Sequence, residues 1–348
     1  MGNKKIWKAA WMFAAFLASL VISKGEASAA GTESQEAQTL QSYIEDQGLF
    51  YGEYGDCMYT YTNQDKEVKI IGLNEKAEKI KLPSKIDGKK VTVIDLVPRS
   101  RFDTDEYALD LRVKKITFPK YINKITVVLL RDHTSPKLKE YRVSPKNQKF
   151  MAKDGVLFSK NGKKLISFPA NKRKETYQIA EGVTTIGEEA FRGCGKIQNI
   201  VMADTVKTIK DQAFYYSSIR TIALSKNLQS LGGHVFNGTE ITEITIPPKV
   251  RTIPEFCFES CKKLKKATIE QGVKRIAPNA FRRCTELRKV FIPPSVTDFD
   301  SGAFVYFSSH VKTKKVNLTI YAKEGSYAYK VAKESGEYGI KVRKWEDA

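Results

Sequence analysis

The stretch VTTIGEEAF, residues 183–191, is one of six versions of a single nine-residue phrase. The other five are VKTIKDQAF (206–214), LQSLGGHVF (228–236), VRTIPEFCF (250–258), VKRIAPNAF (273–281) and VTDFDSGAF (296–304). Their final phenylalanines are spaced by 23, 22, 22, 23 and 23 residues. A fixed period of this length is typical of a solenoid, in which each repeat buries its apolar face only against its neighbours.

A second pattern lies between successive copies of the phrase. It reads IQNIVM (197–202), IRTIAL (219–224), ITEITI (241–246), LKKATI (264–269) and LRKVFI (287–292). The last residues of each segment alternate as in a strand, so Ile244 and Ile246 are expected to face inward, while Glu243 and Thr245 face outward. Prolines at 247–248 and 293–294 are expected to end two of these strands, because proline donates no ladder hydrogen bond. The V-x-x-I letters supply a second inward pair, and A-F fills the turn.

Less regular units precede the six copies. One pairs VTVI (91–94) with VKKITFP (113–119), and another pairs INKI (122–125) with LKEYRVSP (138–145), which gives about eight coils. A hairpin interrupts the series, because Asn161-Gly162 is a type I′ turn signal between two apolar strands. Before the coils, residues 58–73 read as a covering hairpin, and residues 30–50 as a polar, loosely ordered lead-in.

The two ends of the chain carry their own signals. Lys4, Lys5 and Lys8 precede an apolar run from Ala9 to Ile22, and Ala27-Ser28-Ala29 offers small residues for cleavage. The run is short for a membrane span, so it predicts a cleaved signal peptide and no span in the mature chain. Near the other end, Ser326 is expected to cap a short helix with an apolar stripe at Tyr327, Val331 and Ala332, and Gly336 to stop it.

The repeat resembles the BspA-type leucine-rich repeat of bacterial secreted and surface proteins. FRRCTELRKVFIP from Phe281 and FESCKKLKKATI from Phe258 carry the resemblance most closely. The hairpin from Gly155 resembles an insertion common in that family, and LTIYAKEGSYAYKVAKESG (318–336) resembles its C-terminal closure. The resemblance covers roughly residues 56–340, although the chain lacks the asparagine that caps each coil in common leucine-rich repeats. It implies an adhesion or host-interaction protein and no shared catalytic residues.

Together these signals predict a β-rich leucine-rich-repeat solenoid of about eight 22–23-residue coils, some divergent, with an inserted β-hairpin and a short C-terminal capping helix. The expected segments are a signal peptide (1–29), a polar lead-in (30–55), an N-terminal capping hairpin region (56–90), the solenoid (91–325, hairpin insertion about 147–182) and a C-terminal cap (326–348).

The sequence offers no enzymatic constellation. His133, His234 and His310 lie in different repeat contexts, and neither a hydrolase triad nor a set of metal ligands emerges. No phosphate-binding loop or H-E-x-x-H motif is present. We therefore expect no enzyme, no cofactor, no metal and no catalytic residue.

The five cysteines do not form a compact disulfide framework. Cys194, Cys261 and Cys284 each follow the repeated phenylalanine by three residues, and Cys257 takes the alanine position of the phrase. Cysteine behaves as a small, easily buried hydrophobe, so we expect mostly free thiols. The alternative is a Cys261–Cys284 bridge between adjacent coils. Ser217 and Thr239 fill the same position in other coils without a cysteine partner, which indicates that the position needs only a small side chain.

The positive charge of the chain suggests that its surface binds a partner. The net charge of +20 becomes +17 when residues 1–29, with four lysines and one glutamate, are removed. Residues 251–291 hold eleven Lys or Arg against four Glu, which predicts a basic collar around two coils. If the strands stack as one sheet, two outward columns follow. They are Lys115, Glu140, Asn199, Thr221, Glu243, Lys266, Lys289 and Thr117, Arg142, Val201, Ala223, Thr245, Thr268, Phe291.

The candidate partner-binding residues come from these columns: Arg142, Glu243, Lys266, Thr268, Lys289 and Phe291. Strand alternation predicts that Phe291 is exposed beside Lys289, a composition typical of interface hot spots. The expected protein is bacterial, secreted or loosely wall-associated, and binds a protein or an anionic polymer or glycan at a cell surface, with no specific nucleic acid. The alternative is a passive wall-associated protein that positive charge retains on anionic polymers.

Overall fold

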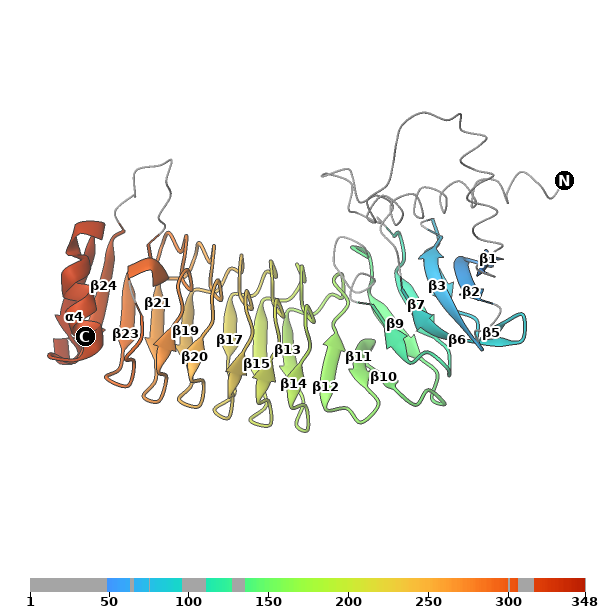
Figure 1. Ribbon diagram of the computed structural model, residues 1–348, viewed down its shortest axis with the longest axis horizontal. Helices are drawn as coiled ribbons and strands as arrows, with labels where there is room; N and C mark the ends of the chain where they lie inside the picture. The colour runs from blue at the N-terminus through green and yellow to red at the C-terminus, as the bar shows by residue number, and fades with distance from the viewer. Residues whose placement is uncertain are drawn as a thin grey trace, which may run out of the picture. The chain divides into compact units, whose positions relative to one another are not determined.

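The structure is a computed structural model that describes residues 49–62, 66–74, 76–95, 111–126, 135–299, 301–305 and 316–347 (Figure 1). The predicted signal peptide lies outside the described residues. The chain divides into two compact units. The first holds the described residues up to 126, with 135–137 and 142–149, and the second holds 138–141 and 150–347. Together the units contain about eleven turns of a β-solenoid, more than the eight predicted.

The N-terminal unit is built from short strands. They are β1 (Leu49–Tyr54), β2 (Cys57–Thr62), β3 (Glu67–Leu73), β4 (Lys79–Lys81), β5 (Lys85–Ile86), β6 (Lys89–Ile94), β7 (Lys115–Phe118), β8 (Lys124–Ile125) and the end of β9 (Glu140–Val143). One sheet has the order β1-β2-β3-β6-β5 with β8 beside β6, and another has the order β4-β7-β9.

The covering hairpin predicted for this unit is present, because β2 and β3 pair antiparallel. The polar lead-in predicted for residues 30–55 is wrong at its end. Residues 49–54 form β1, which pairs antiparallel with β2. The segment LFYGEY alternates as a strand does, and only residues 55–56 separate it from β2. It therefore adds a third strand to the hairpin.

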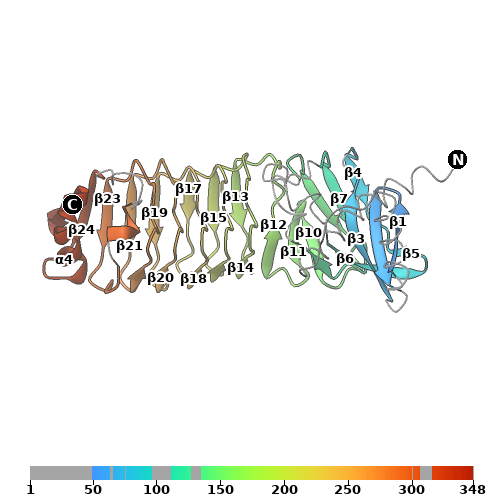
Figure 2. The same ribbon diagram turned by 45° about the horizontal axis from the view of Figure 1, so that its top comes forward.

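Parallel strands repeat through the C-terminal unit (Figure 2). One series contains β13 (Thr176–Ile179), β15 (Asn199–Met202), β17 (Thr221–Ala223), β19 (Glu243–Ile246), β21 (Lys266–Ile269), β23 (Lys289–Ile292), β24 (Leu318–Ala322) and β25 (Ile340–Lys344). The predicted alternation is confirmed in β19, where Ile244 and Ile246 are buried while Glu243 and Thr245 are exposed. Strands β24 and β25 continue the sheet without carrying the repeated phrase, which accounts for part of the larger number of turns.

The V-x-x-I letters form a second series of two-residue strands. These are β14 (Thr185–Ile186), β16 (Thr208–Ile209), β18 (Ser230–Leu231), β20 (Thr252–Ile253) and β22 (Arg275–Ile276). The inward pairs were predicted, and all ten of their side chains are buried. Their pairing as parallel strands adds main-chain hydrogen bonds between coils.

The repeated phenylalanines form a continuous stack inside the C-terminal unit. The ring centroids of Phe191, Phe214, Phe236, Phe258, Phe281 and Phe304 follow one another at 5.0, 5.5, 5.2, 5.0 and 5.2 Å. The rings are nearly parallel and all are buried. Ring pairs at this separation add to the free energy gained by burying the apolar surface. The phrase thus encodes one ring of a common core per coil.

The predicted hairpin is present, but its turn is of another type. Strands β10 (Phe150–Lys153), β11 (Val156–Ser159) and β12 (Lys164–Ser167) pair antiparallel in order. A type I′ turn needs positive φ at both central residues. Only Gly162 has it at φ 70°, and its N–H donates to the Ser159 carbonyl, so Asn161 instead accepts hydrogen bonds with its side chain. The two-residue turn with both φ positive is Asp154-Gly155, between β10 and β11.

All five cysteines are free thiols, as predicted. Cys261 and Cys284 donate from Sγ to the carbonyl of the phenylalanine one coil earlier, each at 3.0 Å. Thr239, in the same position of its coil, donates to Phe236 O at 2.8 Å. The hydroxyl of Ser217 has no hydrogen-bond partner. This position therefore accepts any small side chain, and a donor there satisfies a carbonyl of the core.

Native cysteines should resist thiol reagents. Burial raises the pKa of Cys57 to about 12, and burial also raises the pKa of Cys257 well above its usual range. Because the thiolate is the reactive form, little of it exists at pH 8. We expect negligible modification of folded protein, with Cys284 reacting first because it alone is half-buried, and modification of all five in denaturant. Peptide mapping without reduction would contradict the assignment if it found a 261–284 cross-link.

The C-terminal cap contains helix α4 (Tyr327–Glu334), 3-10 helices η2 (Ser335–Tyr338) and η3 (Trp345–Asp347), and β25, while η1 (Ser301–Ala303) lies in the last repeat. Ser326 caps α4 as predicted, because its side chain accepts from the Tyr329 N–H. Of the predicted stripe, Ala332 is buried and Val331 packs half-buried against the core, whereas Tyr327 is exposed and Ala328 is buried instead. Helix α4 ends at Glu334 with Ser335 as its C-cap, directly before the predicted stop at Gly336, and Gly339, with φ 85°, ends η2.

Candidate functional site: the C-terminal sheet face

Four neighbouring strands build the outward face that contains the candidate residues. Pairing aligns Lys266 on β21, Lys289 on β23, Thr319 on β24 and Lys341 on β25 in one column. The adjacent column is Thr268, Phe291, Tyr321 and Arg343. We name the cationic sheet face as Lys266, Lys289, Lys341, Arg343, Phe291, Tyr321 and Trp345.

Aromatic rings occupy the centre of the cationic sheet face. Phe291 stacks on Tyr321 with centroids 4.7 Å apart, and Trp345 meets Phe291 edge-on at 5.5 Å. Lys266 Nζ lies 5.3 Å from the centroid of Phe291, and Lys289 Nζ lies 5.7 Å from that of Tyr321. These distances are within the range of cation–π attraction.

The prediction that Phe291 is exposed is wrong. Its side chain does point outward from β23, but only 9% of the residue is accessible. Strand β24 brings Tyr321 against one side of the ring, η3 brings Trp345 against its edge, and Lys266 lies over it. The exposed parts of this face are instead the charged ends of Lys289, Lys341 and Arg343.

The structure groups some of the predicted residues and separates others. Glu243, Lys266 and Lys289 align in one column across β19, β21 and β23, and Thr268 lies beside Phe291 on the next strand. Arg142 belongs to the N-terminal unit. Sequence reasoning missed Tyr321, Lys341, Arg343 and Trp345. The alternation in LTIYA and IKVRK was a usable strand signal, but neither segment carries the repeated phrase.

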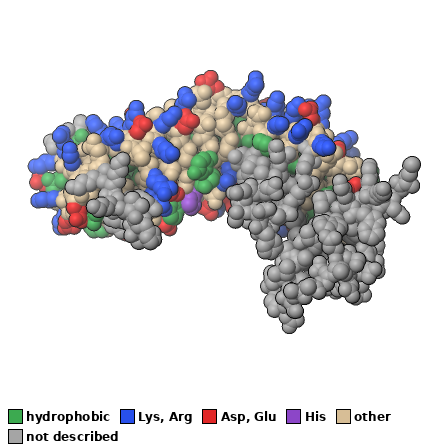
Figure 3. All heavy atoms as spheres, turned by 90° about the horizontal axis from the view of Figure 1, so that it is seen from above, with side chains coloured by type: hydrophobic (Ala, Val, Ile, Leu, Met, Phe, Trp, Pro, Cys, Tyr) green, Lys and Arg blue, Asp and Glu red, His purple; other side chains and the backbone are tan. Residues whose placement is uncertain are grey.

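The predicted basic collar, residues 251–291, is largely exposed, and ion pairs neutralise part of it. Lys263 lies 3.2 Å from Glu240, Arg275 3.2 Å from Asp298 and Arg282 3.5 Å from Glu259. The hydrogen bond from Lys263 lowers the pKa of Glu240, so that carboxylate stays charged. Figure 3 shows Lys and Arg side chains spread along the described surface with Asp and Glu among them.

The described residues contain no group of three His, Cys, Asp or Glu side chains that would hold a metal ion. His234 stacks on Phe256 with centroids 4.8 Å apart, on a turn with φ 54°. His133 and His310 lie outside the described residues. The chemistry available on the cationic sheet face is therefore attraction of anionic groups and apolar contact.

The comparisons with known proteins concern the repeats and the fold. No curated protein matches the chain. A leucine-rich repeat protein from Eubacterium ventriosum is 18% identical, with 77% of this chain and 99% of that chain covered and a TM-score of 0.51. The pneumococcal vaccine antigen PcpA is 14% identical, with 85% and 97% covered and a TM-score of 0.52. At these identities the likeness shows the fold.

Among the described residues, no helix is long and apolar enough to cross a membrane.

The family match agrees with this fold. Residues 170–319 match the BspA type leucine rich repeat region in six copies, the number of phrases that carry the phenylalanine stack. The repeat region of this protein therefore belongs to the BspA-type leucine-rich repeat family.

Proposed function

We propose that the protein is secreted and binds an anionic macromolecule at a cell surface through the cationic sheet face. The observation that supports this most is the placement of Lys266, Lys289, Lys341 and Arg343 around the Phe291–Tyr321 stack. The partner is a protein or an anionic polymer or glycan. BspA-type repeats suit an interaction role, and the family and fold are typically non-enzymatic.

The sheet makes this face suitable for binding. Hydrogen-bonded parallel strands hold the four cations in fixed columns, so binding orders few additional backbone residues. The rings beneath Lys266 and Lys289 restrict the positions of both ammonium groups. A partner with anionic groups spaced along a chain would therefore bind cationic groups whose positions are already fixed before binding.

The alternative function is passive retention, in which the net charge of +17 that remains after removal of residues 1–29 holds the protein on anionic wall polymers. Long-range attraction of this kind depends on the number of charges and weakens with salt. It is nearly indifferent to where the charges lie. A shaped interface depends on position, which makes the two functions separable.

Two charge-matched variants provide the test. Lys266→Glu/Lys289→Glu reverses two charges on the cationic sheet face, and Lys262→Glu/Lys274→Glu reverses two exposed charges elsewhere on the same coils. We expect the first variant to lower affinity for intact cells or isolated wall polymer at physiological salt by about tenfold or more. The second should lower it only a few-fold. Equal losses would favour passive retention, and unchanged melting temperatures of both variants would control for folding.

A further inference from the structure

Both strand series of the C-terminal unit are interrupted at the same junction between coils. The structure describes all of residues 135–299. Within this range, β17 does not pair with β19, and β18 does not pair with β20. The first series therefore splits into β13-β15-β17 and β19-β21-β23-β24-β25. The single continuous sheet assumed from the sequence is wrong at this point.

A pair of prolines distinguishes this junction. At the end of β21, the Glu270 N–H donates to the Ile246 carbonyl at 3.0 Å, and Pro247 takes the position of Glu270 one coil earlier. After β22, the Ala277 N–H donates to the Ile253 carbonyl at 2.9 Å, and Pro254 takes the position of Ala277. Proline has no N–H, so both inter-coil donors are absent at this junction. Pro293 takes the same position as Pro247 two coils later, and β21 still pairs with β23 there, so this junction differs in having a proline at both positions at once.

The coils remain joined elsewhere at this junction. On the turn side, the Phe236 N–H donates to the Cys257 carbonyl at 2.8 Å. At the start of the strands, the Thr242 N–H donates to the Arg220 carbonyl at 3.3 Å. The gap is thus closed where β17 and β19 begin and open toward the ends of the strands.

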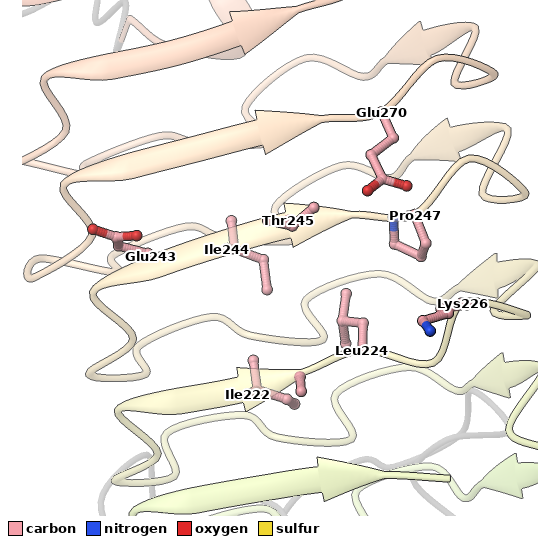
Figure 4. Close-up of a pocket in the computed structure, with 9 residues that line it drawn as sticks. Ile222, Leu224, Lys226, Glu243, Ile244, Thr245, Pro247 and Glu270 are labelled. Carbon is pink, nitrogen blue, oxygen red and sulfur yellow. The ribbon is translucent and has the colours of Figure 1, made fainter. Parts of the chain in front are cut away.

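A cleft of about 380 Å³ occupies the gap (Figure 4). Its apolar lining includes Ile222, Leu224, Ile244 and Pro247. Ile222 and Leu224 hold core positions of their coil yet are half-buried, whereas the equivalent pairs in β15, β19, β21 and β23 are buried. Interruption of the sheet has therefore exposed core side chains in a volume at the lower end of the range for ligand pockets.

Polar groups at the cleft suit a polypeptide. Parallel pairing alternates, so the amide groups of Ile222 and Leu224 on β17, and of Glu243 and Thr245 on β19, point into the gap. The Leu224 carbonyl is the acceptor whose ladder donor is replaced by Pro247. An extended peptide supplies N–H donors and an apolar side chain together.

Charge further defines the occupant. In this strongly basic chain, two of the three charged residues that line the cleft are acidic, Glu243 and Glu270, against Lys226. Figure 4 shows Glu243 near the start of β19, and Glu270 above Pro247 near its end. A basic residue of the peptide next to its apolar one would meet a carboxylate.

We propose that the cleft between β17 and β19 binds an extended peptide segment that has an apolar residue beside a lysine or arginine. The apolar side chain packs on Ile222, Leu224 and Ile244, and the peptide backbone hydrogen-bonds to the strand edges. Neither Lys266 nor Lys289 lines the cleft, so this site is independent of the cationic sheet face.

The probe is the fluorescein-labelled peptide Thr-Lys-Val-Ile-Lys-Thr, with blocked ends, titrated by anisotropy with the full mature chain. Ala223→Trp fills the mouth of the cleft from an exposed position, and we expect it to weaken binding about tenfold or more. Val201→Trp is the matched control, because Val201 pairs with Ala223 in the same outward column but does not line the cleft. It should leave binding unchanged.

Two further arms test the chemistry. Pro247→Ala/Pro254→Ala restores both donors, and we expect it to close the junction, slow amide exchange in β17 and β19, and weaken binding. A probe N-methylated at Val and Ile, or with Glu in place of each Lys, should also bind more weakly. The proposal fails if the parent shows no saturable binding up to about 1 mM. It also fails if Val201→Trp matches Ala223→Trp, or if the N-methylated probe binds equally well.

Discussion

Replacing Phe281 with alanine is expected to lower the free energy of unfolding by about 3–5 kcal/mol. Phe281 is 1% exposed and lies between Phe258 and Phe304, with ring centroids at 5.0 and 5.2 Å. Truncation removes buried surface and leaves a cavity between two coils that contact each other through this ring. A solenoid coil has no other core to share the loss, because each coil packs only on its neighbours.

Thermal and urea unfolding followed by circular dichroism would measure the loss. Tyr216→Ala is the control, because Tyr216 is an aromatic residue that is 58% exposed. Its truncation should lower the free energy of unfolding by less than about 1 kcal/mol. Phe281→Leu, which fills much of the cavity, should fall between the two. Equal melting temperatures for Phe281→Ala and the parent would show that the stack is not the core of the repeat.

Replacing Gly272 with alanine is expected to destabilise the protein by about 2–4 kcal/mol. Gly272 has φ 130°, a conformation that side chains rarely adopt, and an added Cβ would lie 2.3 Å from the Pro248 carbonyl oxygen of the preceding coil. Backbone rather than a flexible side chain opposes the new atom. The substitution must therefore move one coil relative to the next.

Gly182 offers a closely matched control, because both glycines directly precede the valine of the repeated phrase. Gly182 also has positive φ, 89°, but a Cβ there would meet nothing within 4 Å. Gly182→Ala should therefore lower the free energy of unfolding only through the strain of positive φ at a residue with a side chain, by about 1 kcal/mol. The difference between the two melting temperatures measures the clash itself. If the two variants were equally stable, close packing at Pro248 would be disproved.

The six phrases predict the core of the C-terminal unit well, because the same letters meet the same environment in every coil. The phenylalanine at the end of each phrase, the inward Ile244 and Ile246, the small residue at the Cys261 position and the Ser326 cap all follow from local pattern and period. These features depend on contacts within one coil or with its equivalent neighbour. In a repeat protein, such contacts can be predicted from the sequence of a single repeat.

Features that involve unlike segments were not predictable in the same way. Alternation places Phe291 outward correctly, but Trp345 and Tyr321 come from segments outside the repeat and bury it. Pro247 was correctly read as the end of a strand, but not as one of two prolines, with Pro254, that remove donors from both strand series at one junction. This effect depends on which carbonyl faces residue 247, and only the inter-coil hydrogen bonds show this.

The last strand of the sheet bears on how molecules of this protein meet one another in solution. A parallel solenoid sheet ends in a strand whose outer edge offers hydrogen bonds to any other chain, a common start for fibre growth. Here that strand is β25, and it carries Lys341, Arg343 and Lys344 within five residues. Glu324 pairs with Lys344, but Lys341 and Arg343 of two copies that met through this strand would repel each other, so the edge is protected against pairing with its own copy.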